Sequence, residues 1–344
     1  MNLDEVKRFM VRWESLLAVA TILFIVIAGA TTPGLLSDAS KTAAFQLTAE
    51  KAILALPLMM LIIAREIDIS VASIAAFSSI FAGMLMEAGA PVLIAALAAV
   101  IVGALCGCVN GFCVTVLGMP SLVVTLGTLA LFRGLCYAML GSTPITDVSP
   151  GLIDWVYGTL PGSWISNAFL PTLLLIPVFA IALHFRPVGR QIYTIGGEPA
   201  VATYSGVRTQ RVRFGLFVVS GAVAAVAGVI AIGRTSQVSP DALFGYELDA
   251  ITIVFLGGIS FLGGKGRISG VLWAMLLVIA LRQTLLLNGQ GQYAQGTAVG
   301  VLLIGSLLLA NVSQRISGWV TDRRLRARIA QEEASPAAPA EASA

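Results

Sequence analysis

Histidine, cysteine and charged residues are all scarce in this sequence, and each scarcity excludes a class of site. His184 is the only histidine in 344 residues, so neither a multi-histidine metal site nor a Ser-His-Asp triad is expected. The cysteines lie in or beside apolar runs, with neither zinc-ligand spacing nor a disulfide framework, and we interpret them as packing residues: Cys106, Cys108, Cys113 and Cys136. The motifs H-E-x-x-H and G-x-S-x-G are also absent. We therefore expect no enzymatic activity, no bound metal and no cofactor.

A nucleotide site is missing as well. The glycine-rich segment 257–270 contains Lys265, but Gly266 follows it where a phosphate-binding loop has Ser or Thr. Any energy that this chain uses is therefore expected to come from a separate chain or from an ion gradient.

Apolar residues are abundant instead. Hydrophobic residues make up 57% of the chain and charged residues only 11%, against about 25% charged in soluble domains. Runs of roughly 20 apolar residues can cross the ~30 Å core of a bilayer. We count ten such runs, approximately 15–30, 47–64, 69–87, 91–115, 121–140, 168–185, 212–232, 248–263, 269–287 and 297–316. The sequence therefore predicts an all-α, polytopic membrane helical bundle of about ten transmembrane helices.

Lysine and arginine predict the orientation of this bundle. With the N-terminus in the cytoplasm, most of the 21 basic residues fall in cytoplasmic loops, and only Lys41, Lys51 and Arg234 fall in outer loops, as the positive-inside rule requires. Both termini are then cytoplasmic. We expect an interfacial segment at 1–14, a transmembrane domain at 15–320 and a disordered tail at 321–344.

The cytoplasmic loop 186–211 contains the signals of a short helix. Pro199 suits a first helical position, Glu198 places negative charge at the helix start, and Gly206 suits a C-terminal cap. These signals predict a two-turn helix at 199–205, either an ordinary connector or a segment that docks into a groove of another protein. The predicted docking residues are Gly196, Gly197, Glu198, Pro199, Ala200, Ala202, Ser205 and Gly206.

This loop resembles the coupling segment of the ribose-type permeases of ATP-binding-cassette importers, whose substrates are mostly monosaccharides. Three further stretches agree with that family: EIDISVAS at 66–73, NGF at 110–112 followed by VVTLGT at 123–128, and GYELDAI at 245–251. The similarity covers residues 50–315. Where relatives usually have a Gly-Gly pair, this chain has Arg65-Glu66, and this variant looks more like the rhamnose and autoinducer-2 members.

The resemblance implies a permease subunit in the inner (plasma) membrane of a bacterium. Such a subunit translocates a small carbohydrate by alternating access. Its expected partners are an ATP-binding-cassette ATPase, an extracytoplasmic solute-binding protein, a second permease subunit, identical or related, and the lipid bilayer. No nucleic-acid partner is expected. The alternative from a different class is a gradient-driven secondary carrier of a small polar solute, which would need ion-coordinating groups at mid-membrane.

Polar residues within or beside the apolar runs are the candidates for the translocation path. Asp68 and Ser70 stand at the start of a predicted span, where they either cap the helix or contact a polar solute. Asn110 either makes an interhelical hydrogen bond or lines the path. The Glu-x-Asp spacing of the first motif recurs at the start of the 248–263 run, as an inverted repeat would place it. The candidates are Glu66, Asp68, Ser70, Asn110, Thr125, Arg133, Glu247 and Asp249.

Three glycines and two arginines also lie inside apolar runs. Gly103, Gly107 and Gly111 form overlapping G-x-x-x-G steps, which favour close helix packing. Arg133 and Arg282 must pair, reach the interface or face a polar path, because an unpaired guanidinium at the bilayer centre costs several kcal/mol.

Overall fold

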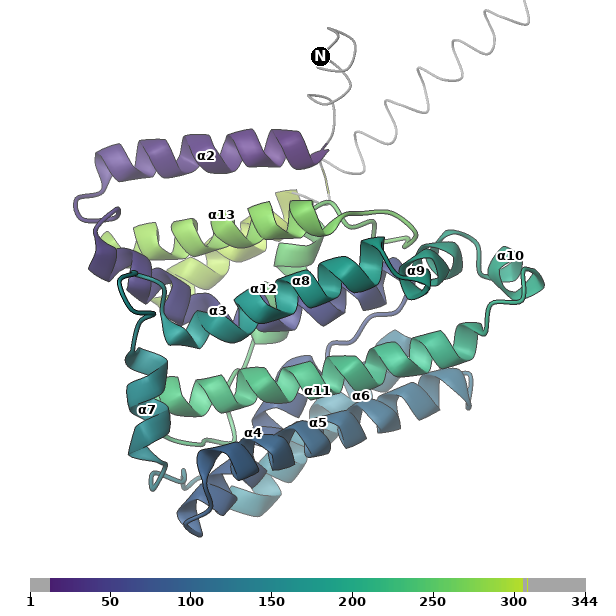
Figure 1. Cartoon of the computed structure of the whole chain (residues 1–344), viewed down its shortest axis with the longest axis horizontal. Helices are drawn as coiled ribbons and strands as arrows, with labels where there is room; N and C mark the ends of the chain where they lie inside the picture. The colour runs from purple at the N-terminus through teal and green to yellow at the C-terminus, as the bar shows by residue number, and fades with distance from the viewer. Residues whose placement is uncertain (1–12, 306–307, 309–344) are drawn as a thin grey trace, which may run out of the picture.

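The computed structural model describes residues 13–305 and 308, and in this part of the chain the regular elements are helices joined by loops, with two isolated β-bridges. Most helices lie along one common direction, and the short helix α7 crosses one end of the bundle (Figure 1). The elements are α2 (Trp13–Thr31), α3 (Asp38–Ile63), α4 (Val71–Glu87), α5 (Val92–Thr115), α6 (Ser121–Leu140), α7 (Pro150–Tyr157), η1 (Asn167–Phe169), α8 (Leu170–His184), α9 (Pro187–Gly197), α10 (Pro199–Tyr204), α11 (Thr209–Thr235), α12 (Tyr246–Leu256) and α13 (Ile268–Leu287).

The multi-pass helical bundle predicted from the sequence is confirmed. Among the described residues, seven helical segments are long and apolar enough to cross a membrane: α2, α3, α5, α6, η1 with α8, α11 and α13. The apolar helix α4, with 17 residues, falls just short of that length.

Helix α12 differs from the predicted span 248–263. It has 11 residues, or about 16 Å of helix, too short to cross the bilayer alone. The helix ends at Gly257, and Gly258 follows with φ 82°, a left-handed conformation natural to glycine. About half of the apolar run is therefore helix, and the rest is a glycine-rich loop. The sequence prediction missed this because a mean hydropathy over the run is not lowered enough by Gly257 and Gly258 to mark the helix end.

Some predicted segments lie wholly or partly outside the described residues. The predicted span 297–316 is helical up to residue 305, and beyond that only Leu308 is described. Of the predicted interfacial segment 1–14, only Trp13 and Glu14 are described, and they begin α2. The predicted tail 321–344 lies entirely outside the described residues.

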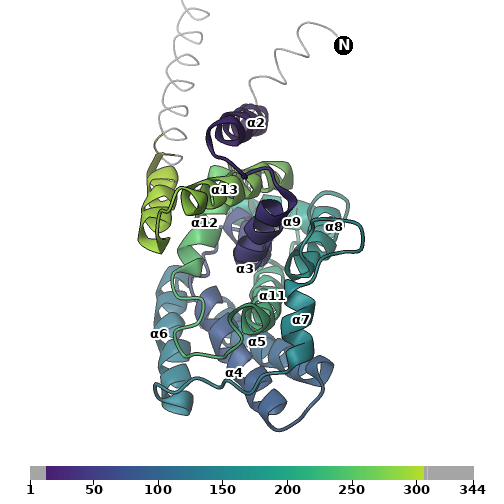
Figure 2. The ribbon, with the colours of Figure 1, turned by 90° about the vertical axis from the view of Figure 1, so that its left-hand side faces the viewer.

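Helix α3 is the central helix of the bundle (Figure 2). Within its most apolar stretch 89% of the residues are buried, against 17% for α2, and every residue from 48 to 64 is buried. Helices α8, α11, α12 and α13 pack against it. Charged side chains on α3, Glu50 and Lys51, are buried, and such groups need protein partners rather than lipid around them, which fits the enclosed position of α3.

Helices α5 and α11 make the most extensive helix-helix contact in the described part of the chain. A Cβ added to Gly103 or Gly107 would overlap the backbone carbonyl of Gly221 or Phe217 on α11. Only glycine permits this approach, so the packing role predicted for the G-x-x-x-G steps is confirmed. The opposite side of α5 exposes large apolar side chains such as Leu105 (59% exposed), as suits contact with lipid or another membrane chain.

The two ends of the bundle carry different features. Helices α9 and α10 lie at one end, which we call the coupling end (Figure 1). Helix α7 and the start of α3 lie at the other, which we call the far end (Figure 1). Helix α11 connects the two, and its Arg213 and Arg234 are about 30 Å apart along the helix axis at 1.5 Å per residue.

Candidate functional site

Helix α10 is the short helix predicted in the loop 186–211. It begins with Pro199 after the N-cap Glu198 and ends with Ser205 as its C-cap. Gly206 follows with φ 79°, which agrees with the predicted glycine cap. The Glu198 side chain makes no capping hydrogen bond, so its contribution to the helix start is limited to its charge.

The face that α10 presents outward is apolar. Val201 is 53% exposed and Tyr204 92% exposed, and residues three apart lie on the same side of a helix. Ala202 is fully buried and anchors the helix to the bundle. Val201 and Tyr204 are not among the docking residues predicted from the sequence, which are mainly the small residues of this loop. The sequence pattern that could have indicated them is their spacing: Val201 and Tyr204 are three residues apart on the short helix, so both side chains lie on one face.

Gly196 and Gly197 hold α10 against the end of α3. A Cβ on Gly196 would overlap the carbonyl oxygen of Ile63, and Gly264 donates its N–H to that same oxygen at 2.8 Å. The end of α3, the end of α9 and the glycine-rich loop after α12 therefore meet at one point, just before α10. Gly196 is thus a close-packing residue, while the predicted docking residues Gly197, Ala200 and Ser205 are exposed.

Arg65 ties the same three segments together. It is a non-glycine residue with φ 65°, a left-handed conformation that costs about 1–2 kcal/mol for a residue with a Cβ. Its Nε donates to the carbonyl oxygen of Leu262 at 2.8 Å, and its Nη2 donates to that of Gly197 at 2.8 Å. A glycine would adopt this backbone conformation without strain, whereas the arginine adds a bond to the base of α10.

Replacing Arg65 separates these two effects. Arg65→Ala removes both hydrogen bonds and keeps the unfavourable backbone conformation, so we expect unfolding to become easier by about 1–2 kcal/mol. Arg65→Gly removes the same bonds and relieves the backbone, so its stability should stay within about 1 kcal/mol of the wild type. Denaturant unfolding of the purified variants measures both. Equal destabilisation by alanine and glycine would contradict this account of the left-handed conformation.

Glu66 forms an ion pair with Arg213. Its side chain is 7% exposed and lies 3.2 Å from Nε of Arg213 at the start of α11. Burial raises the pKa of the Glu66 carboxyl, while a hydrogen bond from Ser121 and the charge of Arg213 act in the opposite direction. Glu66 therefore joins the loop between α3 and α4 to α6 and α11.

Asp68 is the centre of a buried hydrogen-bond cluster. Its Oδ1 accepts from the backbone N–H and the hydroxyl of Ser70, at 3.0 and 2.6 Å, and its Oδ2 accepts from Ser220 on α11 at 3.2 Å. Asn110 on α5 donates to Ser70 Oγ at 2.7 Å. All four residues are fully buried. The interhelical bond predicted for Asn110 is confirmed, and Asp68 joins helices rather than acting as a simple cap.

Thr125 and Arg133 on α6 also bond to backbone carbonyls. Thr125 donates to Ile67 at 3.1 Å. Arg133 donates from Nη1 to Pro240 and Ala242, at 2.6 and 2.8 Å, at the far end. Arg133 is thus satisfied by the loop after α11 and fastens that loop to α6.

At the far end, Asp249 on α12 pairs with Arg282 on α13. The Arg282 Nη2 lies 2.6 Å from Asp249 Oδ1, which gives Arg282 the partner that its position in an apolar run requires. Glu247 is half-buried on the same helix. The eight candidate path residues therefore form two groups, with Arg133, Glu247 and Asp249 at the far end and the others near the coupling end.

The structure adds charged residues that the sequence analysis misplaced. Lys51 was predicted in an outer loop, but it lies on α3 and is only 4% exposed, next to the fully buried Glu50. Glu50 Oε1 is 2.5 Å from Nε of Arg234, and the Arg234 Nη2 donates to the hydroxyl of Tyr246 at 3.1 Å. The Lys51 ammonium lies 3.7 Å from the centre of the Tyr246 ring. The prediction failed because it placed Lys51 by its charge, although residue 51 lies inside the predicted span 47–64, and α3 runs from Asp38 to Ile63.

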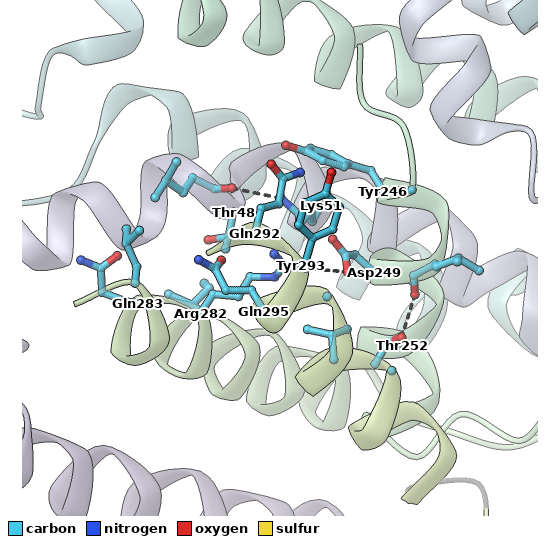
Figure 3. A pocket seen from close by; sticks show the side chains of 18 of the residues that line it. Thr48, Lys51, Tyr246, Asp249, Thr252, Arg282, Gln283, Gln292, Tyr293 and Gln295 are labelled. Atoms are coloured by element: carbon cyan, nitrogen blue, oxygen red, sulfur yellow. Dashed lines mark hydrogen bonds and ion pairs between the residues drawn. The ribbon is translucent and has the colours of Figure 1, made fainter. Parts of the chain in front are cut away.

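Lys51, Arg234 and Tyr246 border a cavity of about 570 Å³ at the far end. It is lined by α3, α12, α13 and residues 290–303, and Figure 3 shows Lys51, Tyr246, Asp249 and Arg282 among its side chains. Of the predicted path residues only Asp249 lines it.

Comparisons with known proteins agree with a transport role. Residues 45–312 match the model of a family described as branched-chain amino acid transport system / permease component. The chain is 29% identical over 310 residues to the ribose import permease protein RbsC of Haemophilus influenzae, covering 89% of this chain and 95% of that protein. It is 32% identical over 318 residues to the autoinducer 2 import system permease protein LsrD of Escherichia coli (strain K12), covering 90% and 96%. No solved structure matches the chain.

The family match spans most of the helical bundle, and both relatives are covered almost completely. Permeases of this kind are transport subunits without catalytic activity of their own. The chain therefore belongs to the permease family of ATP-binding-cassette importers, as a multi-pass membrane protein similar to the ribose and autoinducer-2 import permeases.

Proposed function

We propose that this chain imports a small carbohydrate across the inner membrane of a bacterium, by alternating access driven by partner ATPases. The cargo is a monosaccharide such as rhamnose, or a sugar-like solute of the autoinducer-2 type. The names of the two relatives support this substrate class, as does the Arg65-Glu66 variant of the first motif.

The observation that carries the proposal is the exposed apolar face of α10. Val201 and Tyr204 leave a large apolar surface on a short helix whose base is fixed to the bundle through Arg65 and Gly196. Such a helix fits the groove of a partner protein. Its occupant in this proposal is the cytoplasmic ATPase, which places the coupling end and both termini in the cytoplasm.

Movement of α10 can reach the far end through α3. The base of α10 contacts the end of α3 at Ile63 and Arg65, and the middle of α3 carries Lys51 at the cavity. A rigid, buried helix that links two sites is a physical route for coupling when it has two arrangements. The solute-binding protein then docks at the far end, and a second permease subunit covers part of the exposed apolar sides.

Isolation and reconstitution test this function. The tagged chain, purified from its native membranes in mild detergent, should bring with it an ATPase and a soluble solute-binding protein. In liposomes, the assembled complex should accumulate radiolabelled rhamnose or ribose with ATP inside, and an ionophore that collapses ion gradients should leave this uptake unchanged. Accumulation by the isolated chain on a proton or sodium gradient alone would show a secondary carrier instead.

A further inference from the structure

The far-end cavity has the size and lining of a small-molecule site. Its volume of about 570 Å³ lies within the roughly 300–1,000 Å³ typical of such sites. It combines apolar walls from α3 and α13 with a few charged and amide side chains (Figure 3). The question is which ligand chemistry those polar groups require.

Gln283 on α13 is a buried carboxamide with an unused polar atom. It is 4% exposed, and its Nε2 donates to Ser40 Oγ at 2.9 Å, but its Oε1 has no hydrogen-bond partner among the described residues. Buried polar groups are nearly always paired, so this atom marks a missing partner. If the oxygen and nitrogen of the Gln283 amide are exchanged, the NH₂ group is the one without a hydrogen-bond partner. A ligand hydroxyl suits both orientations, because it donates and accepts.

Two cationic side chains in the same cavity have unused donors. Lys51 Nζ donates to the carbonyl oxygen of Leu47 at 3.3 Å, and no carboxylate lies within ion-pair distance of it in the described part of the chain. Arg282 pairs with Asp249, but its Nε has no hydrogen-bond partner among the described residues. These donors require acceptor oxygens from a ligand.

The charge of the ligand follows from Asp249. Its carboxylate lines the same cavity as Lys51, Arg234 and Arg282. Arg282 is already paired with Asp249 and Arg234 with Glu50, so an anionic ligand beside Asp249 would meet a like charge in a site of low dielectric constant. An uncharged ligand with several hydroxyl groups satisfies the donors of Lys51 and Arg282 and the free atom of Gln283 without that repulsion.

We infer that the far-end cavity binds one uncharged, polyhydroxylated solute of monosaccharide size, held by Gln283, Lys51 and Arg282. The inference rests on the proposed function, because it makes the cavity a stopping point for the transported solute. Lys51 also lies on α3, the helix whose other end is fixed to α10, so binding and coupling share one element.

Equilibrium dialysis against radiolabelled rhamnose and ribose measures this binding directly. The full chain with its ATPase is placed in lipid nanodiscs without its solute-binding protein and without glycosidic detergents, whose sugar head groups would compete. The wild type should bind one of the two sugars. Gln283→Leu and Lys51→Met should each weaken that binding about three- to tenfold, as expected for the loss of one or two hydrogen bonds.

Gln46→Leu is the matched control. Gln46 is a buried glutamine (9% exposed) on α3 with one unpartnered amide nitrogen, and it does not line the cavity. Its replacement should leave sugar affinity unchanged. If Gln283→Leu does not fold, Lys51→Met alone decides the matter.

Two outcomes separate this site from the proposed function. If the wild type imports sugar with ATP, but Gln283→Leu and Lys51→Met bind sugar as tightly as the wild type does, the proposed site is wrong and the proposed function stands. Sugar binding that both variants weaken, in a complex that ATP does not drive, upholds the site and overturns the function.

Discussion

Tyr204→Asp is expected to reduce ATP-driven uptake at least about thirtyfold, while the protein still inserts and folds. Tyr204 is 92% exposed on α10 and makes no side-chain hydrogen bond within the described part of the chain, so its replacement costs the isolated permease little. A tyrosine at the centre of a docked surface is worth 2 kcal/mol or more, and an aspartate buried there adds an unpaired charge. The measurement is uptake into liposomes that contain the assembled complex.

Tyr204→Phe is the control for this prediction. It keeps the ring and removes only the hydroxyl, so uptake should stay within about threefold of the wild type. Co-purification of the ATPase with each variant separates lost docking from lost transport. Wild-type uptake by Tyr204→Asp together with normal ATPase retention would contradict the assignment of α10 as the docking helix.

Local signals made α10 predictable from the sequence. Pro199, Glu198 and Gly206 lie within nine consecutive residues, and each has the position in the structure that its residue type favours. The glycines of α5 were predictable for a similar reason, because a four-residue spacing specifies one face of a helix whatever packs against it.

The ion pairs were not predictable, because their partners are far apart in the sequence. Glu50 and Arg234 are separated by 184 positions, and nothing near Glu50 indicates which helix will face it. Arg282 was noted as needing a partner, but Asp249 was noted separately as a path residue. Only the packing of α12 against α13 brings these two together.

Glu50→Gln is expected to destabilise the folded protein by about 3–5 kcal/mol, the usual cost of removing one partner of a buried ion pair. The ion pair is buried: the Glu50 side chain is 0% exposed, and the Arg234 side chain is 17% exposed. The variant leaves Arg234 with Tyr246 as its remaining side-chain hydrogen-bond partner among the described residues. Unfolding free energies in bicelles measure the loss.

Asp38→Asn provides the contrast, because it breaks the ion pair with Lys41 on the same helix. The Asp38 side chain is 78% exposed, so the change should cost less than about 1 kcal/mol. In the double variant Glu50→Gln/Arg234→Gln no charge is left unpaired at this position, so its loss should be smaller than the sum of the two single losses. Additive losses would mean that the two side chains act independently and that the pair does not hold α3 against α11. If the double variant loses less unfolding free energy than the sum of the two single variants, Glu50 and Arg234 stabilise the fold as a pair. That pair then holds α3 against α11 beside the cavity at the far end.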